Sequence, residues 1–585
     1  MVRDYLLVET ITAGEAIARV LAAEGVRRVF GLPGGHVLAI YDALYDAPGI
    51  DHILVRHEHA AASMAAASAQ LNGEPGVCLV TAGPGATNLL TAIAEAYVGC
   101  LPIVILSGRA TTATAHRGAA QEIATERVFA PVTKWSVRVD RADLIVDVLR
   151  QAFATAGTGR PGPVLVDLPR DLLDSEVPWT GYVPVGPRPR PPADEDQIAA
   201  AAAALASARR PILIAGGGAS ASESWNEVRE LAELLAIPVL TSLAGRGSIP
   251  DDHPLSAGGL GVHRTRLSKR LLIEADVVLG VGFRFKEMET NWRAGFVPGP
   301  DATSVQVDID PVEIGRSVPA QIGVVGDARV VLRHLIDRLA DSAAALAPGA
   351  YADHPRTVAV ADEIASLRAE IDGLAASGHL PMHPLRPIRA VRALFPRQTT
   401  VAIDVGCLAQ HMAGAHPYFE VFEPRSLIVP SSFYGMGFAA AALPAARLVH
   451  PDRPTVGFVG DGSFQMVMSI LPVAAEYRLG VTWCVLGDSA LGSIRDIQHY
   501  RHGERYLATA FEVQPDFAAI ASACGCHGER VEDPEQVDEA VLRALRANEQ
   551  GRPAVLDFAV APERVEGTLE HFTYYPRPAE VEAVA

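Results

Sequence analysis

Lysine is scarce in this sequence, and its scarcity bears on the partners the chain can have. Only three lysines occur among 585 residues (Lys134, Lys269 and Lys286), and the formal net charge is −18. A protein that binds nucleic acid or an acidic membrane surface through its charge carries clustered basic residues. We therefore expect neither nucleic acid nor a membrane as a partner.

Long apolar runs, a Walker A motif and abundant cysteine are also missing. No apolar run reaches transmembrane length, and the start, Met1 to Tyr5, does not read as a signal peptide. The lack of a Walker A sequence excludes a P-loop nucleotidase on motif grounds. The six cysteines are scattered and mostly lie in apolar segments, which indicates free thiols in a reducing compartment. We therefore expect a cytoplasmic enzyme.

Strand and helix patterns alternate along the whole chain. Short, β-branched apolar segments typical of buried parallel strands are followed by helical segments. A proline- and arginine-rich linker at 184–192 and a partly helical connector at 344–377 divide this pattern into three blocks. We predict three doubly wound α/β domains with parallel sheets, at residues 1–180, 194–345 and 380–585.

The individual strands are expected as follows. In the first block a strand enters a glycine turn at 29–36, and further strands lie at 53–58, 77–81, 102–106 and 163–168. The second block has strands at 211–215, 238–241, 277–281 and 304–309, and the third at 399–403, 455–459 and 481–486. The glycines at 216–218 weakly resemble a dinucleotide-binding loop, and a nicotinamide oxidoreductase is a distant alternative.

The segment from Val459 to Arg495 carries the clearest functional pattern. A glycine turn follows the strand at 455–459, a crossover helix is expected at 464–476, and the next strand lies at 481–486. Asp461 and Asp488 then fall at the carboxyl ends of neighbouring strands, where open α/β sheets bind ligands. Two carboxylates beside a helix end that can hold phosphate suit Mg²⁺, which keeps diphosphate oxygens and water in its shell. The alternative is an ordinary βαβ unit with a surface turn.

The order of seven motifs resembles the thiamine-diphosphate (ThDP) enzymes of the acetolactate synthase branch, which includes benzaldehyde lyase, pyruvate oxidase and oxalyl-CoA decarboxylase. The resemblance covers nearly all of the chain. It is carried by Phe-Gly-Leu-Pro-Gly-Gly (30–35), Arg-His-Glu (56–58), Thr-Ala-Gly-Pro-Gly-Ala-Thr-Asn (81–88), Pro-Val-Thr-Lys-Trp (131–135), Gly-Pro-Val-Leu-Val-Asp-Leu-Pro (162–169), Gly-Met-Gly (435–437) and Gly-Asp-Gly (460–462). Gly487 and Asp488 stand where the family usually has two asparagines, so Asp488 keeps an oxygen ligand but adds a charge.

The resemblance implies ThDP and Mg²⁺ as cofactors, held by a pyrimidine-binding, a middle and a diphosphate-binding domain in that order. It assigns Asp461, Asp488 and the backbone carbonyl of Ala490 to the metal, and Met436 to the support of a bent cofactor. Glu58 is expected to share a proton with the pyrimidine ring, at the end of a buried strand where its pKa can rise. The other implied cofactor-binding residues are Gly34, Gly35, Pro84, Asn88, Gly435, Gly460, Gly462, Ser463, Leu491 and Gly492. A homodimer or homotetramer with active sites between subunits is also implied.

The residues that select the substrate are less typical of the synthases. His36 stands where benzaldehyde lyase also has a histidine, and Gln121 matches an active-site glutamine of both branches. Both are assigned here as catalytic. Ala120 replaces a phenylalanine of the synthases, which opens the pocket. His116 is another candidate for the pocket wall, against the simpler interpretation of a surface histidine.

Two further features leave alternatives open. Arg495, Arg501 and Arg505 form either a rim for a phosphate or carboxylate group, as in a CoA thioester, or a solvated helix face. The middle domain of the family binds FAD, ADP or nothing, and neither Arg284-Phe285 nor Asp308-Ile309-Asp310-Pro311 decides between these.

We therefore predict a ThDP- and Mg²⁺-dependent carboligase or lyase. It makes or breaks a C–C bond next to the carbonyl of a 2-oxo acid, a 2-hydroxy acid or an acyloin, as acetolactate synthase does. The first alternative is a 2-hydroxyacyl-CoA lyase or an enzyme like oxalyl-CoA decarboxylase, with an acyl-CoA substrate. The second is a non-catalytic protein with the ThDP fold, against which the presence of both Glu58 and Asp461 argues.

Overall fold

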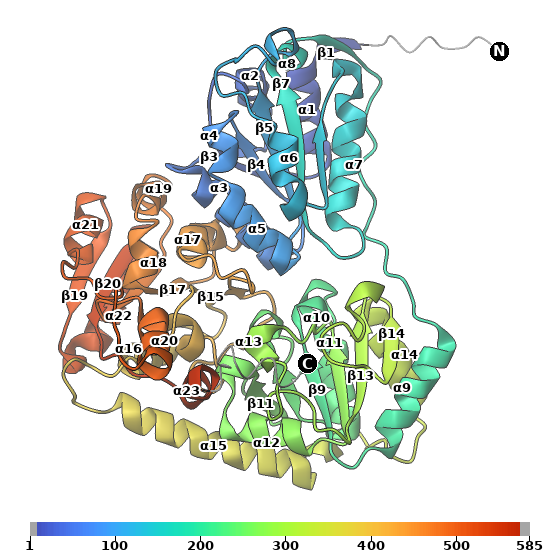
Figure 1. Cartoon of the computed structure of the whole chain (residues 1–585), viewed down its shortest axis with the longest axis vertical. Coiled ribbons are helices and arrows are strands. Elements are labelled where there is room, and N and C mark those ends of the chain that lie inside the picture. The colour runs from blue at the N-terminus through green and yellow to red at the C-terminus, as the bar shows by residue number, and fades with distance from the viewer. Residues whose placement is uncertain (1–8, 574–585) are drawn as a thin grey trace. The chain divides into compact units, whose positions relative to one another are not determined.

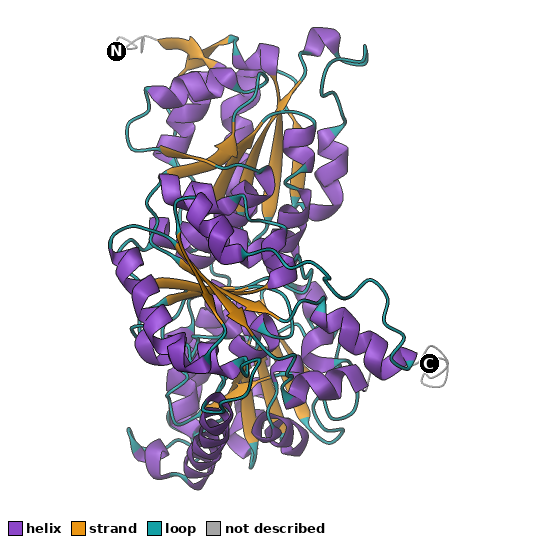
Figure 2. Ribbon diagram, turned by 90° about the vertical axis from the view of Figure 1, so that its left-hand side faces the viewer, coloured by secondary structure: helices purple, strands orange, loops and turns teal. Residues whose placement is uncertain are grey.

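The computed structural model describes residues 9–573 and contains three sheets of six parallel strands each. Helices cover both faces of the sheets, as Figures 1 and 2 show. The predicted fold class, three α/β domains with parallel sheets, is confirmed. Most interior strands are buried along their whole length, as expected for parallel strands enclosed between helices.

The first sheet has the strand order β3-β2-β4-β5-β7-β6. Its strands are β2 (Arg28–Leu32), β3 (Asp51–Leu54), β4 (Gly76–Val80), β5 (Ile103–Arg109), β6 (Trp135–Arg138) and β7 (Pro163–Pro169). Its helices are α1 (Ala13–Ala23), α2 (Leu38–Tyr45), α3 (Glu58–Asn72), α4 (Pro84–Thr87), α5 (Leu90–Gly99), α6 (Thr125–Phe129), α7 (Ile145–Gly157) and α8 (Arg170–Leu173). The chain runs outward in one direction from β2 and in the other from β4, so the strand order reverses between these two strands. Ligands bind at such a reversal, beyond the carboxyl ends of the strands.

Three strands of the first domain were not predicted. The edge strand β6 pairs only with β7, and the strands β1 (Glu9–Thr12) and β8 (Glu176–Trp179) form a separate antiparallel pair. The predicted strand at 53–58 is too long, because β3 pairs with β2 only as far as Leu54. Beyond that residue the chain turns into α3.

The middle sheet has the order β11-β10-β9-β12-β13-β14, with two strands, β11 and β14, that were not predicted. The strands are β9 (Pro211–Ala215), β10 (Val239–Thr241), β11 (Ser256–Gly259), β12 (Val277–Val281), β13 (Thr303–Asp308) and β14 (Ile322–Val325). The helices are α9 (Glu195–Ser207), α10 (Gly217–Ala221), α11 (Trp225–Leu235), α12 (Arg266–Glu274), α13 (Glu287–Thr290) and α14 (Ala328–Leu339), followed by α15 (Pro355–Ala375) in the second connector.

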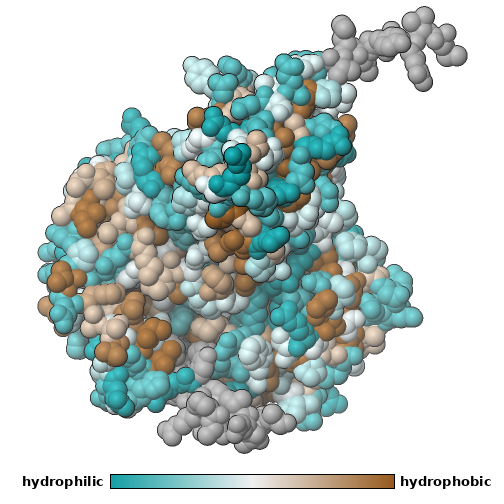
Figure 3. All heavy atoms as spheres, turned by 45° about the horizontal axis from the view of Figure 1, so that its top comes forward, coloured by the Kyte–Doolittle hydropathy of each residue, from teal (hydrophilic) through white to brown (hydrophobic). Residues whose placement is uncertain are grey.

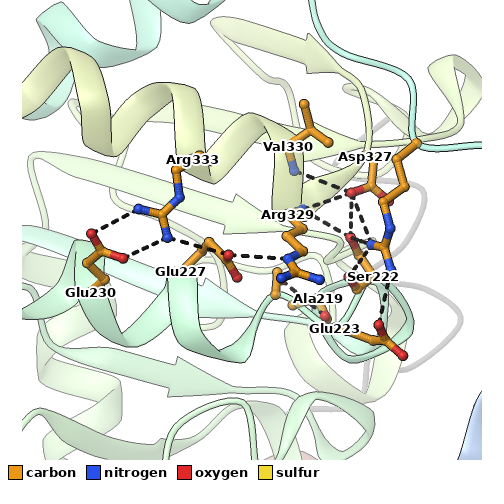
Figure 4. A network of polar contacts seen from close by, with 11 residues as sticks. Ala219, Ser222, Glu223, Glu227, Glu230, Asp327, Arg329, Val330 and Arg333 are labelled. Atoms are coloured by element: carbon orange, nitrogen blue, oxygen red, sulfur yellow. Dashed lines mark hydrogen bonds and ion pairs between the residues drawn. The ribbon is translucent and has the colours of Figure 1, made fainter.

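Asp327 organises the start of the middle domain. Its carboxylate accepts hydrogen bonds from the backbone N–H groups of Arg329 (3.1 Å) and Val330 (3.3 Å) at the start of α14, and from the Ser222 hydroxyl at 2.7 Å. Arg190, at the end of the linker, forms ion pairs with Asp327 and Glu223. Figure 4 shows this network, which attaches the linker to the first turn of α14.

We expect Asp327→Ala to lower the free energy of unfolding by about 1–2 kcal/mol, the usual cost of losing a helix N-cap. The loss follows because the Val330 N–H loses its side-chain acceptor, while the Arg329 N–H keeps only the Ser222 hydroxyl at 3.0 Å. The midpoint of urea unfolding measures it. Asp337→Ala, at an exposed position of the same helix, is the matched control. Equal midpoints for the two variants would contradict a capping role for Asp327.

The third sheet has the order β16-β15-β17-β18-β20-β19. Its strands are β15 (Thr400–Ile403), β16 (Leu427–Ile428), β17 (Thr455–Gly460), β18 (Thr482–Gly487), β19 (His527–Val531) and β20 (Ala554–Ala559). Its helices are α16 (Leu385–Leu394), α18 (Asp461–Gln465), α19 (Ile470–Glu476), α20 (Gly492–His502), α21 (Phe517–Ala523), α22 (Val537–Glu549) and α23 (Glu566–Thr573). The predicted single crossover helix at 464–476 is wrong, since a turn at 466–469 separates α18 from α19. The order reverses between β15 and β17.

The described chain divides into two compact units. One holds the residues up to Pro189 together with Phe433–Val449, and the other holds Arg190–Ser432 with His450 onward. Helix α17 (Phe438–Val449) packs against α3 within the first unit. The third domain in the chain therefore contributes one helix to the first unit, and the three predicted boundaries remain a proposal.

Large hydrophobic side chains are exposed singly or in small groups. The most exposed are Tyr45, Val513 and Leu507. On the face shown in Figure 3, hydrophobic residues lie in small patches among hydrophilic ones. No helix among residues 9–573 is both long and apolar enough to cross a bilayer.

Candidate active site

Glu58 is the first residue of α3 and not the last residue of a strand. His57 is extended and caps the helix, with its side chain accepting a hydrogen bond from the His59 N–H at 3.1 Å. A carboxylate in the first turn is favoured by the unpaired N–H groups and dipole of the helix. Glu58 is only 6% exposed, and the side-chain amide of Asn88 donates a hydrogen bond to its Oε2 at 2.8 Å. Two predicted cofactor-binding residues are thus in direct contact.

Glycines allow the loops beyond β2 and β4 to approach each other closely. A Cβ added to Gly34 would lie 2.5 Å from the Thr81 side chain, and one added to Gly85 would lie 2.8 Å from it. Gly83 has a φ of +58°, and a Cβ there would lie 2.8 Å from the Gln121 carbonyl oxygen. Only glycine fits at these positions without a steric clash. The absence of side chains there lets the loops approach each other where the strand order reverses, between β2 and β4. Gly35 and Pro84, also predicted, are exposed on the same loops.

His36 lies in this group of loops, half-buried. Its Nδ1 is 3.4 Å from the Thr81 hydroxyl, and its ring forms a hydrogen bond with the Gln121 side chain. Burial lowers the pKa of His36, the charge of Arg170 lowers it further, and the bond to Gln121 acts in the opposite direction. The neutral ring is therefore favoured at neutral pH. His36 and Gln121, which the sequence analysis assigned together, are in contact.

Gln121 itself is exposed, and its backbone has the left-handed φ of +62°. His116, the other candidate in this loop, is exposed and donates its backbone N–H to Glu122 at 2.7 Å. This arrangement agrees with a surface histidine. Ala120 is also exposed.

Asp461 lies at the carboxyl end of β17, as predicted, and begins α18. It is 2% exposed, and its two oxygens accept hydrogen bonds from the backbone N–H groups of Gly462 (2.7 Å) and Ser489 (2.8 Å) and from the Gln514 side-chain amide (2.8 Å). Burial and the nearby charge of Asp488 raise the pKa of Asp461 to about 6. The bond to Ser489 ties the end of β17 to the end of β18.

Asp488 follows β18 directly, and its side chain is 4% exposed. Its Oδ2 is buried and has no hydrogen-bond partner among the described residues. Burial raises the pKa of Asp488, and the charge of Arg564 lowers it. Two buried carboxylates, one with an orphaned oxygen, thus follow neighbouring strands.

Ala490 lies in a short antiparallel bridge to Ala510. Its neighbours secure the bridge, because Leu491 N–H donates to Thr509 O at 2.9 Å and Phe511 N–H donates to Ser489 O at 2.8 Å. A Cβ at Gly462 would lie 3.1 Å from the Leu491 side chain, so Gly462 and Leu491 are adjacent. Both are predicted to bind the cofactor, which requires them to lie close together. The Ser463 hydroxyl donates to the Val405 carbonyl at 3.4 Å, which joins α18 to the loop after β15.

This donor set fits Mg²⁺ with a diphosphate. Mg²⁺ is usually held by one or two carboxylates and completes its shell with water and phosphate oxygens. The orphaned Oδ2 of Asp488 supplies an oxygen without competing hydrogen bonds. Among the residues described here, no cluster of three or more histidine, cysteine, aspartate or glutamate side chains is placed to hold a metal. A metal at this position would therefore need backbone, cofactor or water oxygens as well.

Sequence reasoning missed Gln514, Asp496 and Arg564 at this site. Arg564 forms ion pairs with Asp496 and, at 3.7 Å, with Asp488. Gln514 and Arg564 are distant in the sequence from the Gly-Asp-Gly motif and belong to no recognised pattern. The sequence offered one indication of such a partner, the extra charge of Asp488, because a buried carboxylate is stable only beside a cation or hydrogen-bond donors.

The remaining predicted residues make other contacts. Gly435 donates its N–H to the buried Glu95 at 2.9 Å, and the neighbouring Met436 is half-buried. Arg495 is exposed on α20 and stacks over Tyr506, with 5.3 Å between its guanidinium carbon and the ring centroid. Arg501 is half-buried on α20, and Arg505 is exposed just beyond its end. A common anion-binding rim of these arginines stays a prediction.

The middle domain uses its glycine run for packing. The N–H groups of Gly216 and Gly218 donate to the carbonyls of Val281 (2.9 Å) and Gly282 (3.0 Å). A Cβ at Gly216 would lie 2.1 Å from the Gly282 oxygen. These two N–H groups are thus committed to the neighbouring loop and do not point at a phosphate, which weakens the resemblance to a dinucleotide loop.

Three family models match the chain. They are described as "Thiamine pyrophosphate enzyme, N-terminal TPP binding domain" at residues 11–128, "Thiamine pyrophosphate enzyme, central domain" at 198–335 and "Thiamine pyrophosphate enzyme, C-terminal TPP binding domain" at 404–558. Together these matches cover more than half of the chain and follow the predicted domain order.

Known relatives match over nearly the full length. The "Probable acetolactate synthase large subunit" of Methanocaldococcus jannaschii is 36% identical, over 94% of this chain and 92% of the relative. The "Acetolactate synthase isozyme 3 large subunit" of Escherichia coli is 35% identical, over 94% of this chain and 95% of the relative. The "Acetolactate synthase" of Mycobacterium bovis is 34% identical, over 95% and 89% respectively.

Proposed function

We propose that this chain, which belongs to the thiamine pyrophosphate enzyme family, joins or cleaves 2-oxo acid units next to a carbonyl, as an acetolactate synthase does. The chain is a ThDP-dependent carboligase, as its family models and relatives show. The proposal of an acetolactate synthase-like reaction rests on the similarity to acetolactate synthase large subunits along almost the whole chain. ThDP, when bound, supplies the nucleophilic carbon and the electron sink that C–C bond exchange next to a carbonyl requires.

The residues of the third domain would bind the cofactor through its metal. We assign Asp461, Asp488 and the Ala490 carbonyl to Mg²⁺, and Gly460, Gly462, Ser463, Leu491 and Gly492 to the diphosphate. The buried carboxylates, the orphaned Oδ2 of Asp488 and the close contact of Gly462 with Leu491 support this assignment.

The residues of the first domain would act on protons. Glu58 would hold the proton that it shares with the cofactor ring, and the amide of Asn88 holds the Glu58 Oε2 in place. His36, neutral at neutral pH and oriented by Gln121, can take a proton from a substrate hydroxyl or return it to an alkoxide oxygen. Ala120, where the synthases have a phenylalanine, would leave the substrate pocket more open.

The quaternary structure and the middle domain complete the proposal. We propose a homodimer or a homotetramer with active sites between subunits. The assignment of Glu58 and Asp461 to different compact units is compatible with this. A nucleotide in the middle domain, FAD or ADP, would have a structural role without a redox change. The six cysteines form no disulfide bonds, as is usual in a reducing compartment, which supports a cytoplasmic location.

The substrate is tested by mass spectrometry of ligands released from the purified protein, followed by a screen of 2-oxo acids and acyl-CoA thioesters. We expect released ThDP, and turnover of pyruvate or a related 2-oxo acid with formation of a new C–C bond. Turnover of acyl-CoA thioesters alone would replace this proposal with a 2-hydroxyacyl-CoA lyase or oxalyl-CoA decarboxylase activity.

We expect His36→Ala to lower kcat by about 10²-fold, the lower end of general acid–base contributions, while ThDP affinity changes little. The reason is that the ring contacts Gln121 and Thr81, neither of which is a predicted metal ligand. Gln121→Ala should lower kcat in the same direction but less. Steady-state kinetics beside a ThDP titration separates the two effects. His116→Ala, in the same loop, is the control, and full kcat in His36→Ala would remove the catalytic assignment.

A further inference from the structure

Arg564 lies beside the predicted metal ligand Asp488. Its Nη2 is 3.7 Å from Asp488 Oδ2, and its Nε is paired with Asp496 in the first half of α20. The Arg564 side chain is 6% exposed, the Asp488 side chain 4% and the Asp496 side chain 16%. The guanidinium therefore bridges two carboxylates in a largely water-excluded position.

The close approach of Arg564 to Asp488 depends on Gly492. A Cβ at Gly492 would lie 2.8 Å from Arg564 Nη2 and 3.2 Å from Asp488 Oδ2. Any side chain here would therefore push into the pair. The first residue of α20 thus leaves room for the arginine and the carboxylate at once.

The charges at the site explain why a cation is needed. Asp461 and Asp488 together carry two negative charges in a buried setting, whereas the usual aspartate and asparagine of the family carry one. A diphosphate adds more negative charge at the same place, and like charges in a buried site repel strongly. Arg564 places one positive charge beside Asp488 and shares it with Asp496, so it offsets part of the added negative charge. The other charges near Asp488 are those of Asp496, which Arg564 also pairs, and of Arg495.

The distance also matters. At 3.7 Å the guanidinium is too far from Asp488 Oδ2 for a hydrogen bond, and this oxygen has no other hydrogen-bond partner among residues 9–573. Asp496 accepts hydrogen bonds from both Nε and Nη2 of Arg564, the latter at 3.3 Å, and so fixes the guanidinium. The oxygen is therefore electrostatically compensated and still available to a cation.

We propose that Arg564 is a positioning residue, which compensates the charge that Asp488 brings to the metal site and thereby allows an anionic diphosphate to bind there. The inference rests on the proposed assignment of Asp461 and Asp488 to Mg²⁺. It predicts that Arg564 matters for cofactor binding only while residue 488 is an aspartate.

A double-mutant cycle on the full-length apoenzyme tests this coupling. ThDP affinity is measured by calorimetry at saturating Mg²⁺ for the wild type, Arg564→Gln, Asp488→Asn and the double variant. We expect Arg564→Gln to weaken ThDP binding about tenfold or more in the wild-type background, which corresponds to about 1.4 kcal/mol. In the Asp488→Asn background the same substitution should cost less than about threefold.

A purely structural role gives a different pattern. In that case Arg564→Gln weakens binding by the same factor in both backgrounds, because the Asp496 pair is lost in both, and this result would overturn the proposal. Arg564→Lys keeps the charge and should recover part of the affinity. If Arg564→Gln does not fold, the cycle is run with Arg564→Lys, where a smaller loss, still confined to the aspartate background, is expected.

Two control variants show whether a negative result concerns the role of Arg564 or the assignment of the metal site. Arg530→Gln removes another arginine from an ion pair in the same sheet, with Asp557 at 2.8 Å, and should leave ThDP affinity unchanged. Asp461→Ala reports on the site itself. If ThDP binds Asp461→Ala as tightly as it binds the wild type, the metal site is misassigned. If Asp461→Ala fails to bind but the cycle shows no coupling, only the role of Arg564 is wrong.

Discussion

Glu58→Gln is expected to bind ThDP normally but to lose about 10²–10⁴-fold in kcat, the range of a general acid–base step. Glutamine keeps the shape of the side chain and an oxygen that can accept from Asn88, but it cannot exchange a proton with the cofactor ring. Exchange of the cofactor C2 proton with deuterium, followed by NMR, reports this step directly. ThDP titration of the same variant shows whether binding is intact.

Glu227→Gln is the matched control for this prediction. Glu227 is also a buried glutamate, 5% exposed, but it pairs with Arg329 and Arg333 in the middle domain (Figure 4). Its substitution should affect stability and leave proton exchange unchanged. Near-wild-type turnover of Glu58→Gln would withdraw the assignment of Glu58 as the proton switch.

Asp461→Ala is expected to abolish Mg²⁺-dependent binding of ThDP. Loss of an outer-sphere partner alone costs about 10–100-fold in metal affinity, so loss of a direct ligand should cost at least as much. The substitution also frees the Ser489 and Gly462 N–H groups and the Gln514 amide, which loosens the loop after β18. Calorimetric titration of the apoenzyme with ThDP, with and without Mg²⁺, measures the effect.

Asp452→Ala and Asp488→Asn are the comparisons for Asp461→Ala. Asp452 is exposed on the loop before β17, so its loss should leave ThDP affinity unchanged. Asp488→Asn restores the residue usual in the family and should have a mild effect. Complete loss of the cofactor in Asp488→Asn would show that the second metal ligand lies elsewhere.

Glu58→Gln and Asp461→Ala, mixed together, test the proposed subunit arrangement. If each active site takes Glu58 from one subunit and Asp461 from another, a mixed dimer of Glu58→Gln and Asp461→Ala contains one intact site. Refolding the two variants together should then restore part of the activity. If each site is built within one chain, every site in the mixture carries a defect and no activity returns.

Local sequence patterns determined the fold class, the order of the domains and most interior strands. Strands such as β4, β5 and β17 are short, apolar and buried on both faces, so their composition alone identifies them. The strands that were missed include the edge strands β6, β11, β14 and β16, which pair on one side only. Their existence depends on a neighbouring strand, which a local pattern does not reveal.

The sequence also predicted candidate site residues by itself, because the expected cofactor chemistry restricts which residue types can serve it. Asp461 follows a buried strand in a glycine turn, Glu58 ends the Arg-His-Glu motif, and His36 and Gln121 match single positions of the family outside the seven motifs. Only the tertiary structure decided how these residues are held: Glu58 begins a helix instead of ending a strand, and His36 contacts both Thr81 and Gln121. Only the tertiary structure, too, brought Gln514 and Arg564 to Asp461 and Asp488. Arg564 meets Asp488 because the parallel strands β18 and β20 end at one edge of the sheet, and Gln514 reaches Asp461 from the loop before α21. Both placements are properties of the packed fold and not of any local segment.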